Sequence, residues 1–135
     1  MRTAPGRHAA ESPALEGAWV AVAAQLGQRS LPIEQLRVRY LLLKAEHYDI
    51  VDRSNQVVDG GDYRLNAQAT PASLDIVGRT GPHAGRTMQA IYELNGDELT
   101  VCYDLEGHAR PRTMQPQTNQ LLLRITYART AIPLA

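Results

Sequence analysis

The chain has 135 residues, with 14 basic and 14 acidic side chains, so its formal net charge at pH 7 is zero. A chain of this length suits one domain, which can bury a hydrophobic core without needing disulfide bonds or a bound metal ion for stability. The balanced charge argues against a nucleic-acid partner and against an anionic membrane surface, because both select a clustered excess of Lys and Arg. The single cysteine, Cys102, excludes an internal disulfide framework.

The first residues show no hydrophobic periodicity. Residues 1–14 are rich in Ala, Pro, Gly and Arg, so we expect a flexible arm there. They lack the continuous apolar centre of a signal peptide, and no apolar run in the chain approaches the roughly 20 residues that a membrane helix needs. Taken as given, the chain is predicted to be cytoplasmic and not inserted in a membrane; a leader trimmed from it would instead make the protein exported.

The rest of the chain is predicted to be one β-domain over residues 15–130, followed by a tail over 131–135. Alternating or apolar runs bounded by Gly, Pro, Asn and Asp predict eight strands, over 19–26, 38–43, 47–51, 56–65, 73–77, 88–94, 98–103 and 120–128. We expect the first strand to be buried on both faces. Pro32 at a helix-start position predicts one helical turn over 31–36. Gly60-Gly61 predicts a bulge or sharp bend in its strand.

The strands on either side of Asn95-Gly96 form the clearest element, since Asn-Gly is the strongest short-range signal for a hairpin. With these two residues as the loop, Tyr92 would face Leu99. One face of the hairpin would then carry mainly apolar residues, namely Met88, Ala90, Tyr92, Leu94, Leu99, Val101 and Tyr103. The opposite face, which includes Ile91 and Cys102, is predicted to be mostly wet.

Each predicted strand connects locally to the next, which favours an up-and-down barrel over a sandwich. The predicted fold class is therefore all-β, an antiparallel eight-stranded β-barrel with one short helical turn. Such a barrel has an interior just large enough either to pack itself or to hold one small ligand.

A series of short motifs, in this order along the chain, resembles a known family. The motifs are Leu15-Glu-Gly-Ala-Trp19, Gly61-Asp-Tyr63, Gly85-Arg-Thr87, Ile91-Tyr-Glu-Leu-Asn-Gly-Asp97, Leu99-x-x-Cys102-Tyr103, Gly107 and Arg110-Pro111. Over residues 15–129 the chain resembles a group of small bacterial lipocalin-like domains whose function is uncharacterised. The resemblance implies a calycin-type barrel and supplies no catalytic residues.

Gly17-Ala18-Trp19 also resembles the G-x-W signature of lipocalins. In that signature the Trp closes the barrel floor under an Arg from the last strand. Arg124 and Arg129 are the two candidates for this Arg, which would make a cation–π contact with Trp19.

The chain has six tyrosines and no phenylalanine. All six fall on the apolar sides of their predicted strands: Tyr40, Tyr48, Tyr63, Tyr92, Tyr103 and Tyr127. If the tyrosine hydroxyls point into one barrel, the interior would have apolar walls with a few polar groups, which is typical of a ligand site. The alternative is a set of ordinary core tyrosines whose tips reach water.

We therefore hypothesise a binding module, without cofactor, metal or catalytic residues, that holds a small hydrophobic molecule. The predicted ligand-binding residues are Tyr40, Tyr48, Met88, Tyr92, Tyr103 and Leu123 in the walls, with Arg110 and Arg112 for an anionic head group. Loops over 78–85 and 104–119 would form or cover the mouth. Two alternatives stay open: a protein-interaction or structural module with a filled barrel, and a small-barrel enzyme without an identifiable catalytic set. The oligomeric state also stays open, with a dimer through an edge near Gly60-Gly61 as one option.

Other reactive side chains give weaker signals. His83, His108 and Arg110 would cluster if the two long loops meet at one mouth; otherwise the histidines are ordinary surface residues. Cys102 has no His at a fixed offset to activate it, so we interpret it as a packing residue and not as a nucleophile.

Overall fold

The computed structural model describes residues 14–131, so the predicted arm over 1–14 and the tail over 131–135 lie almost entirely outside the described residues. Within this range the chain forms strands and one short 3-10 helix, η1 (Ile33–Gln35). The strands are β1 (Gly17–Leu26), β2 (Arg29–Leu31), β3 (Tyr40–Lys44), β4 (His47–Val51), β5 (Val57–Asn66), β6 (Ser73–Thr80), β7 (Thr87–Asn95), β8 (Glu98–Asp104) and β9 (Leu122–Thr130). In the same range no helix is long and apolar enough to cross a membrane.

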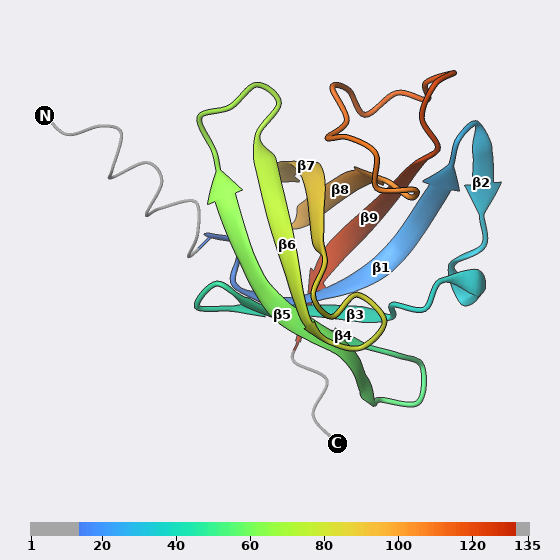
Figure 1. The fold of residues 1–135 in the computed structure, drawn as a ribbon. Helices are drawn as coiled ribbons and strands as arrows, with labels where there is room; N and C mark the ends of the chain where they lie inside the picture. Colours follow the sequence, from blue (N-terminus) through green and yellow to red (C-terminus); the bar gives the residue numbers. More distant parts are fainter. Residues whose placement is uncertain (1–13, 132–135) are drawn as a thin grey trace, which may run out of the picture.

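Strand β1 pairs with both β3 and β9, and this double pairing closes the sheet. The eight strands β1 and β3–β9 form an antiparallel barrel in which each strand from β3 onward pairs with the next along the chain (Figure 1). The predicted all-β, eight-stranded barrel is confirmed, and η1 lies within the predicted helical turn. The short strand β2, which pairs only with the last part of β1, was not predicted.

Register shifts interrupt three strand pairings of the barrel wall: β4 with β5, β5 with β6, and β1 with β9. The pairing of β5 with β6 shifts at the predicted position, between Gly60 and Gly61, but the extra residue is Arg79 of β6 and not a residue of β5. The idea of an open edge at this point is wrong, because β5 pairs with β6 on both sides of the bulge. The pairing of β1 with β9 shifts between Ala21 and Ala23, and Val22 between them is 47% exposed. The prediction that β1 is buried on both faces is therefore wrong at this bulge.

The hairpin of β7 and β8 forms as predicted, but its turn lies one residue further along. Asn95 pairs with Glu98 and Tyr92 pairs with Val101, so the turn consists of Gly96 and Asp97. Of these two residues, only Gly96 has a positive φ, of 62°. Gly at the first central position is the pattern of a type II′ turn. The predicted cross-strand partners are wrong, because each residue of β7 pairs with a residue of β8 two positions further along than predicted. A shift of two residues keeps every side chain on the same face, so the predicted faces are right.

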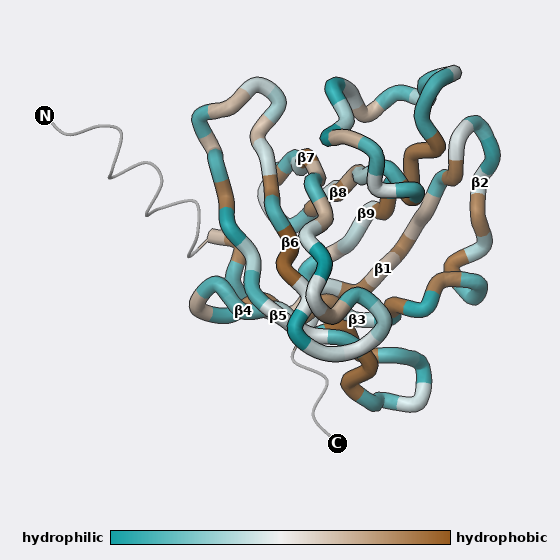
Figure 2. The backbone as a smooth tube through the Cα atoms, in the orientation of Figure 1, coloured by the Kyte–Doolittle hydropathy of each residue, from teal (hydrophilic) through white to brown (hydrophobic). Residues whose placement is uncertain are grey.

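The main core lies inside the barrel. Its most deeply buried large side chains include Trp19, Tyr63, Tyr92 and Leu99, each no more than 2% exposed. Figure 2 shows apolar and polar residues mixed along the strands, whereas the long connection between β8 and β9 is largely polar. This mixture is expected of a barrel whose strands point alternate side chains inward and outward.

A second, smaller core lies on the outside of the wall. Ile91 of β7 and Cys102 of β8 point outward, yet they are 1% and 0% exposed. They form a cluster with Leu122, against which Met114 of the β8–β9 connection packs. The prediction of a mostly wet outer face is therefore wrong for these two residues, because the connection covers them.

Candidate functional site

The segment before β1 is fastened to the end of β9. Trp19 is fully buried, and the Arg129 guanidinium carbon lies 4.3 Å from the centroid of its ring. The Trp19 indole Nε1 donates to the carbonyl of Leu15 at 2.9 Å. Of the two predicted candidates, Arg129 makes the contact with Trp19. Arg124 instead donates to the Gln25 side chain and to the carbonyl of Met114.

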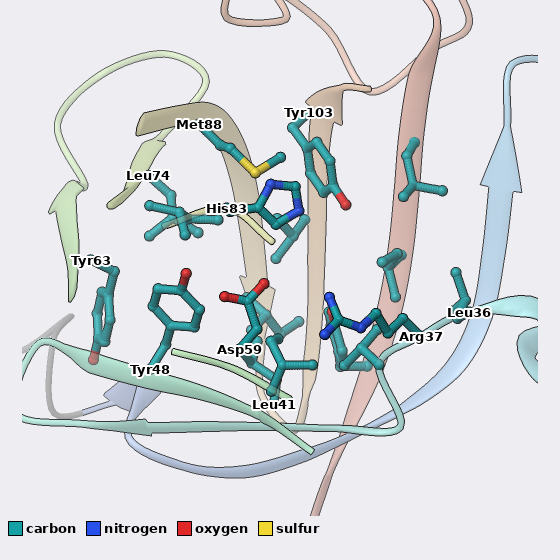
Figure 3. Close-up of a pocket in the computed structure, with 18 of the residues that line it drawn as sticks. Leu36, Arg37, Leu41, Tyr48, Asp59, Tyr63, Leu74, His83, Met88 and Tyr103 are labelled. Carbon is teal, nitrogen blue, oxygen red and sulfur yellow. The ribbon is translucent and has the colours of Figure 1, made fainter. Parts of the chain in front are cut away.

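A cavity of about 340 Å³ lies inside the barrel (Figure 3). Its walls are mainly apolar. They come from the strands, from the segments before β1 and between β1 and β3, and from the start of the β8–β9 connection: Leu15, Leu26, Leu31, Leu36, Val38, Leu41, Leu43, Ile50, Leu65, Leu74, Ile76, Met88, Leu99, Val101, Leu105, Leu123 and Ile125. The polar lining residues are Gln35, Arg37, Tyr48, Asp59, Tyr63, His83, Tyr103 and Tyr127. This volume is at the low end of the range for small-molecule sites.

Half of the predicted ligand-binding residues line this cavity. Tyr48, Met88, Tyr103 and Leu123 all contribute to its wall. Tyr92 does not line the cavity, although it is 1% exposed and belongs to the interior core.

Tyr40 points away from the cavity. In β3 the buried residues are Leu41 and Leu43, which line the cavity, so Tyr40 faces the other way, with the Arg39 guanidinium 5.0 Å from its ring centroid. The predicted inward orientation of Tyr40 is wrong because the strand starts at Tyr40 and not at residue 38. Val38 also lines the cavity, so the alternation breaks between Val38 and Leu41.

The two predicted arginines lie outside the cavity lining. Arg110 pairs with Asp75 of β6 at 2.6 Å and donates to the carbonyl of Ala90 at 2.9 Å. These contacts hold the β8–β9 connection against the barrel wall, and only Leu105 of this connection reaches the cavity. Arg112 is exposed. The connection therefore contributes Leu105 to the cavity wall, while Met114 packs on the outer apolar cluster.

The predicted group of His83, His108 and Arg110 does not form. His83 lines the cavity, whereas His108 is 3.9 Å from carboxylate oxygens of both Asp104 and Glu106. Asp104, Glu106 and His108 have ligand atoms within 4.8 Å of one another, a spacing that would suit a metal ion. The Asp104 oxygens already accept hydrogen bonds from the Glu106 backbone and the Gln120 amide, so we assign this cluster a role in shaping the connection.

Asp59 is a buried cavity residue that the sequence did not lead us to predict. It is 5% exposed, and its Oδ1 atom has no hydrogen-bond partner among the described residues. Figure 3 shows its carboxylate directed into the cavity. A usable signal was present, because alternation back from the inward-facing Tyr63 and Leu65 places Gly61 and Asp59 on the same face.

The turn between β6 and β7 packs directly against Asp59. A Cβ atom at Gly81, whose φ is +82°, would lie 2.6 Å from the Val58 carbonyl and 3.0 Å from the Asp59 Oδ1. Only glycine therefore fits at this approach. The turn folds back on β6, since the Gly78 and Arg86 backbones are hydrogen-bonded and Gly85 donates to Gly78. This fold carries His83 to the cavity.

Arg37 approaches the cavity from the segment between β1 and β3. Its Nη2 atom donates to the Val58 carbonyl at 2.8 Å, next to Asp59 in sequence. Its side chain is exposed, in contrast to the buried carboxylate. No ion pair joins Asp59 to a basic side chain within residues 14–131.

Burial sets the ionisation of the interior tyrosines. Burial raises the pKa of Tyr48 to about 12, and the Asp59 carboxylate adds to this shift. The pKa of Tyr103 is likewise raised to about 12, first by burial and then by Asp59. Burial, and then Tyr103, raises the pKa of Tyr127 further. The phenols are therefore neutral near pH 7, and the cavity offers neutral hydroxyls and one carboxylate within apolar walls.

Neither a family model, nor a curated protein, nor a solved structure matches this chain.

Proposed function

We propose that the barrel binds a small, largely apolar molecule in its interior, without covalent chemistry. The observation that carries this proposal is the cavity of about 340 Å³ with predominantly apolar walls. A filled barrel, which the sequence left open as an alternative, would pack this space with side chains. Transfer of apolar surface from water stabilises the complex by about 25 cal/mol per Å². The interior hydroxyls would orient the ligand.

The resemblance to small lipocalin-like domains agrees with this proposal, and we propose that the barrel is of that calycin type. Two features support the assignment. The G-x-W segment, Gly17-Ala18-Trp19, opens β1, and an Arg from the last strand lies over its Trp. The barrel is also an eight-stranded meander whose interior is open enough for a ligand.

A cavity-filling variant tests the binding site. Ile76 lines the cavity from β6, so Ile76→Trp should occupy the space that the ligand needs. We expect 2-phenylethanol, a neutral probe with one ring, to raise the melting temperature of the native protein and to have no effect on Ile76→Trp. Calorimetric titration with the same probe should give saturable binding to the native protein only.

The matched control places the same bulk outside the barrel. Val22 is 47% exposed at the bulge of β1, so Val22→Trp should bind the probe as the native protein does. The proposal fails if single-ring and short-chain apolar probes leave the native melting temperature unchanged at saturating concentration. It fails equally if Ile76→Trp folds and still binds them with native affinity.

A further inference from the structure

The Asp59 carboxylate is a buried polar group of the cavity that has no counter-charge among the described residues. It is 5% exposed, it faces the cavity, and its Oδ1 atom has no hydrogen-bond partner within residues 14–131. An ionised carboxylate in such a position normally has a counter-charge or a full set of donors, because removing a charge from water is costly. Because the carboxylate lines the cavity, a counter-charge for it would have to approach from there.

The groups around Asp59 do not supply this counter-charge. Figure 3 shows the Tyr48 hydroxyl beside the carboxylate, with Tyr103, His83 and Arg37 directed toward the same space. Tyr48 and Tyr103 are neutral phenols near pH 7, so neither neutralises the carboxylate. Gly81 closes the side of Asp59 that faces the β6–β7 turn, because a Cβ atom there would lie 3.0 Å from Oδ1.

We propose that the ligand carries a protonated amine, which pairs with the Asp59 carboxylate while its apolar part occupies the barrel. This inference rests on the proposed function and names the chemical class of its ligand. An ammonium supplies the counter-charge that the carboxylate lacks and donates hydrogen bonds to it. The cavity of about 340 Å³ suits a compact molecule, such as an arylalkylamine with one ring or a short alkylamine.

An anionic ligand bound by Arg37 fits the same site less well. The Arg37 side chain is exposed, so an ion pair with it would be weakened by water and salt. The same anion would bring a second negative charge toward the buried Asp59. A cationic ligand should bind more strongly than an anionic one, because it pairs with a carboxylate that the protein already holds away from water.

Three probes of nearly the same shape separate these cases: 2-phenylethylamine, 2-phenylethanol and 3-phenylpropanoate. Calorimetric titration at pH 7 should show the amine binding roughly tenfold or more tightly than the alcohol, the effect expected of one hydrogen bond between charged groups. The carboxylate should bind more weakly than the alcohol. If the alcohol or the carboxylate binds as tightly as the amine, the inference is overturned.

Asp59→Asn keeps the shape of the side chain and removes its charge. It should lower amine affinity by about tenfold or more and change alcohol affinity by less than about threefold. Asp62→Asn is the matched control, since Asp62 lies on the same strand but is 45% exposed outside the barrel and pairs with Arg79. This control should bind all three probes as the native protein does.

The outcomes distinguish the inference from the proposed function on which it rests. If none of the three probes binds the native protein, the proposed ligand cavity itself is refuted. If the probes bind without preference for the amine, or Asp59→Asn keeps that preference, the cavity stands and the role of Asp59 falls. The comparison of probes on the native protein decides the question even if Asp59→Asn does not fold.

Discussion

Trp19 and Arg129 are cross-strand partners at the junction where the first strand of the barrel meets the last. The guanidinium lies 4.3 Å from the indole centroid and also donates to the carbonyls of Ala14 and Glu16 at 2.7 and 2.9 Å. It donates as well to the Asp97 carboxylate in the β7–β8 turn, at 3.1 Å. One side chain therefore connects the segment before β1, the closing strand pair and a neighbouring hairpin.

The first prediction concerns this connection. Arg129→Ala should lower the free energy of unfolding by about 2 kcal/mol, because it removes the cation–π contact and leaves two carbonyls without their donor. Arg129→Lys should lose about half as much, since an ammonium keeps the charge but not the planar fork of donors. Urea denaturation measures both values. Arg112→Ala, which removes an exposed charge, serves as the control, and its free energy of unfolding should be close to that of the native protein. If Arg129→Lys were as stable as the native protein, the planar guanidinium of Arg129 would not have the role assigned to it.

How far the sequence predicts this architecture depends on how local each signal is. Strand β4 was predicted with its observed bounds, and the faces of the β7–β8 hairpin were right, because alternation is a property of neighbouring residues. The turn was misplaced by one residue because a loop over residues 95–96 and a loop over residues 96–97 give the two strands the same inward and outward faces. The orientation of Tyr40 was wrong for a different reason: the alternation breaks before β3, and no residue type marks that break.

The site was predictable only in part. Four of the predicted residues line the cavity because inward-facing tyrosines and aliphatic residues obey the same alternation as the core. Asp59 obeys it too, but an acidic residue in a strand is usually taken to face water. The position of the β8–β9 connection was not predictable, since its residues have no period and its docking on Ile91 and Cys102 is a long-range contact.

The second prediction concerns Cys102. Its side chain is fully buried beneath the β8–β9 connection, and burial raises the pKa of its thiol to about 11. Both effects lower the concentration of accessible thiolate. At pH 8 we expect dithionitrobenzoate to leave the native thiol unmodified on a timescale in which the urea-unfolded protein reacts completely.

Met114 supplies the comparison, because it packs against the cluster that contains Cys102. Met114→Ala should speed the reaction of the native thiol by thinning its cover. A stoichiometric reaction of the native protein as fast as that of the unfolded chain would contradict the burial of Cys102.

The third prediction follows from the interior phenols. In the unfolded chain tyrosines ionise near pH 10, about their ordinary pKa, whereas the pKa values of Tyr48 and Tyr103 are raised to about 12 in the folded protein. Between these limits the folded state holds more protons than the unfolded state, so stability is fully present below about pH 10 and falls as pH rises toward about 12. Urea denaturation across this window should show the decline.

Tyr103→Phe removes one of these groups and should make the decline less steep. A native slope that is flat across the window would contradict the raised pKa values.

The fourth prediction concerns Gly61, which lies at the register shift between β5 and β6 and on the same face of β5 as Asp59. A Cβ atom at Gly61 would lie 2.0 Å from the carbonyl oxygen of Val77, a backbone atom of β6 that cannot move without breaking the strand pair. Gly61→Ala should therefore lower the free energy of unfolding by about 2–3 kcal/mol, the usual cost of overpacking. Gly60→Ala is the matched neighbour, because its closest contact would be the Asp49 carboxylate at 2.9 Å, the end of a side chain that can turn away. Thermal denaturation should rank the native protein above Gly60→Ala and Gly60→Ala above Gly61→Ala; the reverse order of the two variants would show that β5 and β6 do not approach each other at Gly61.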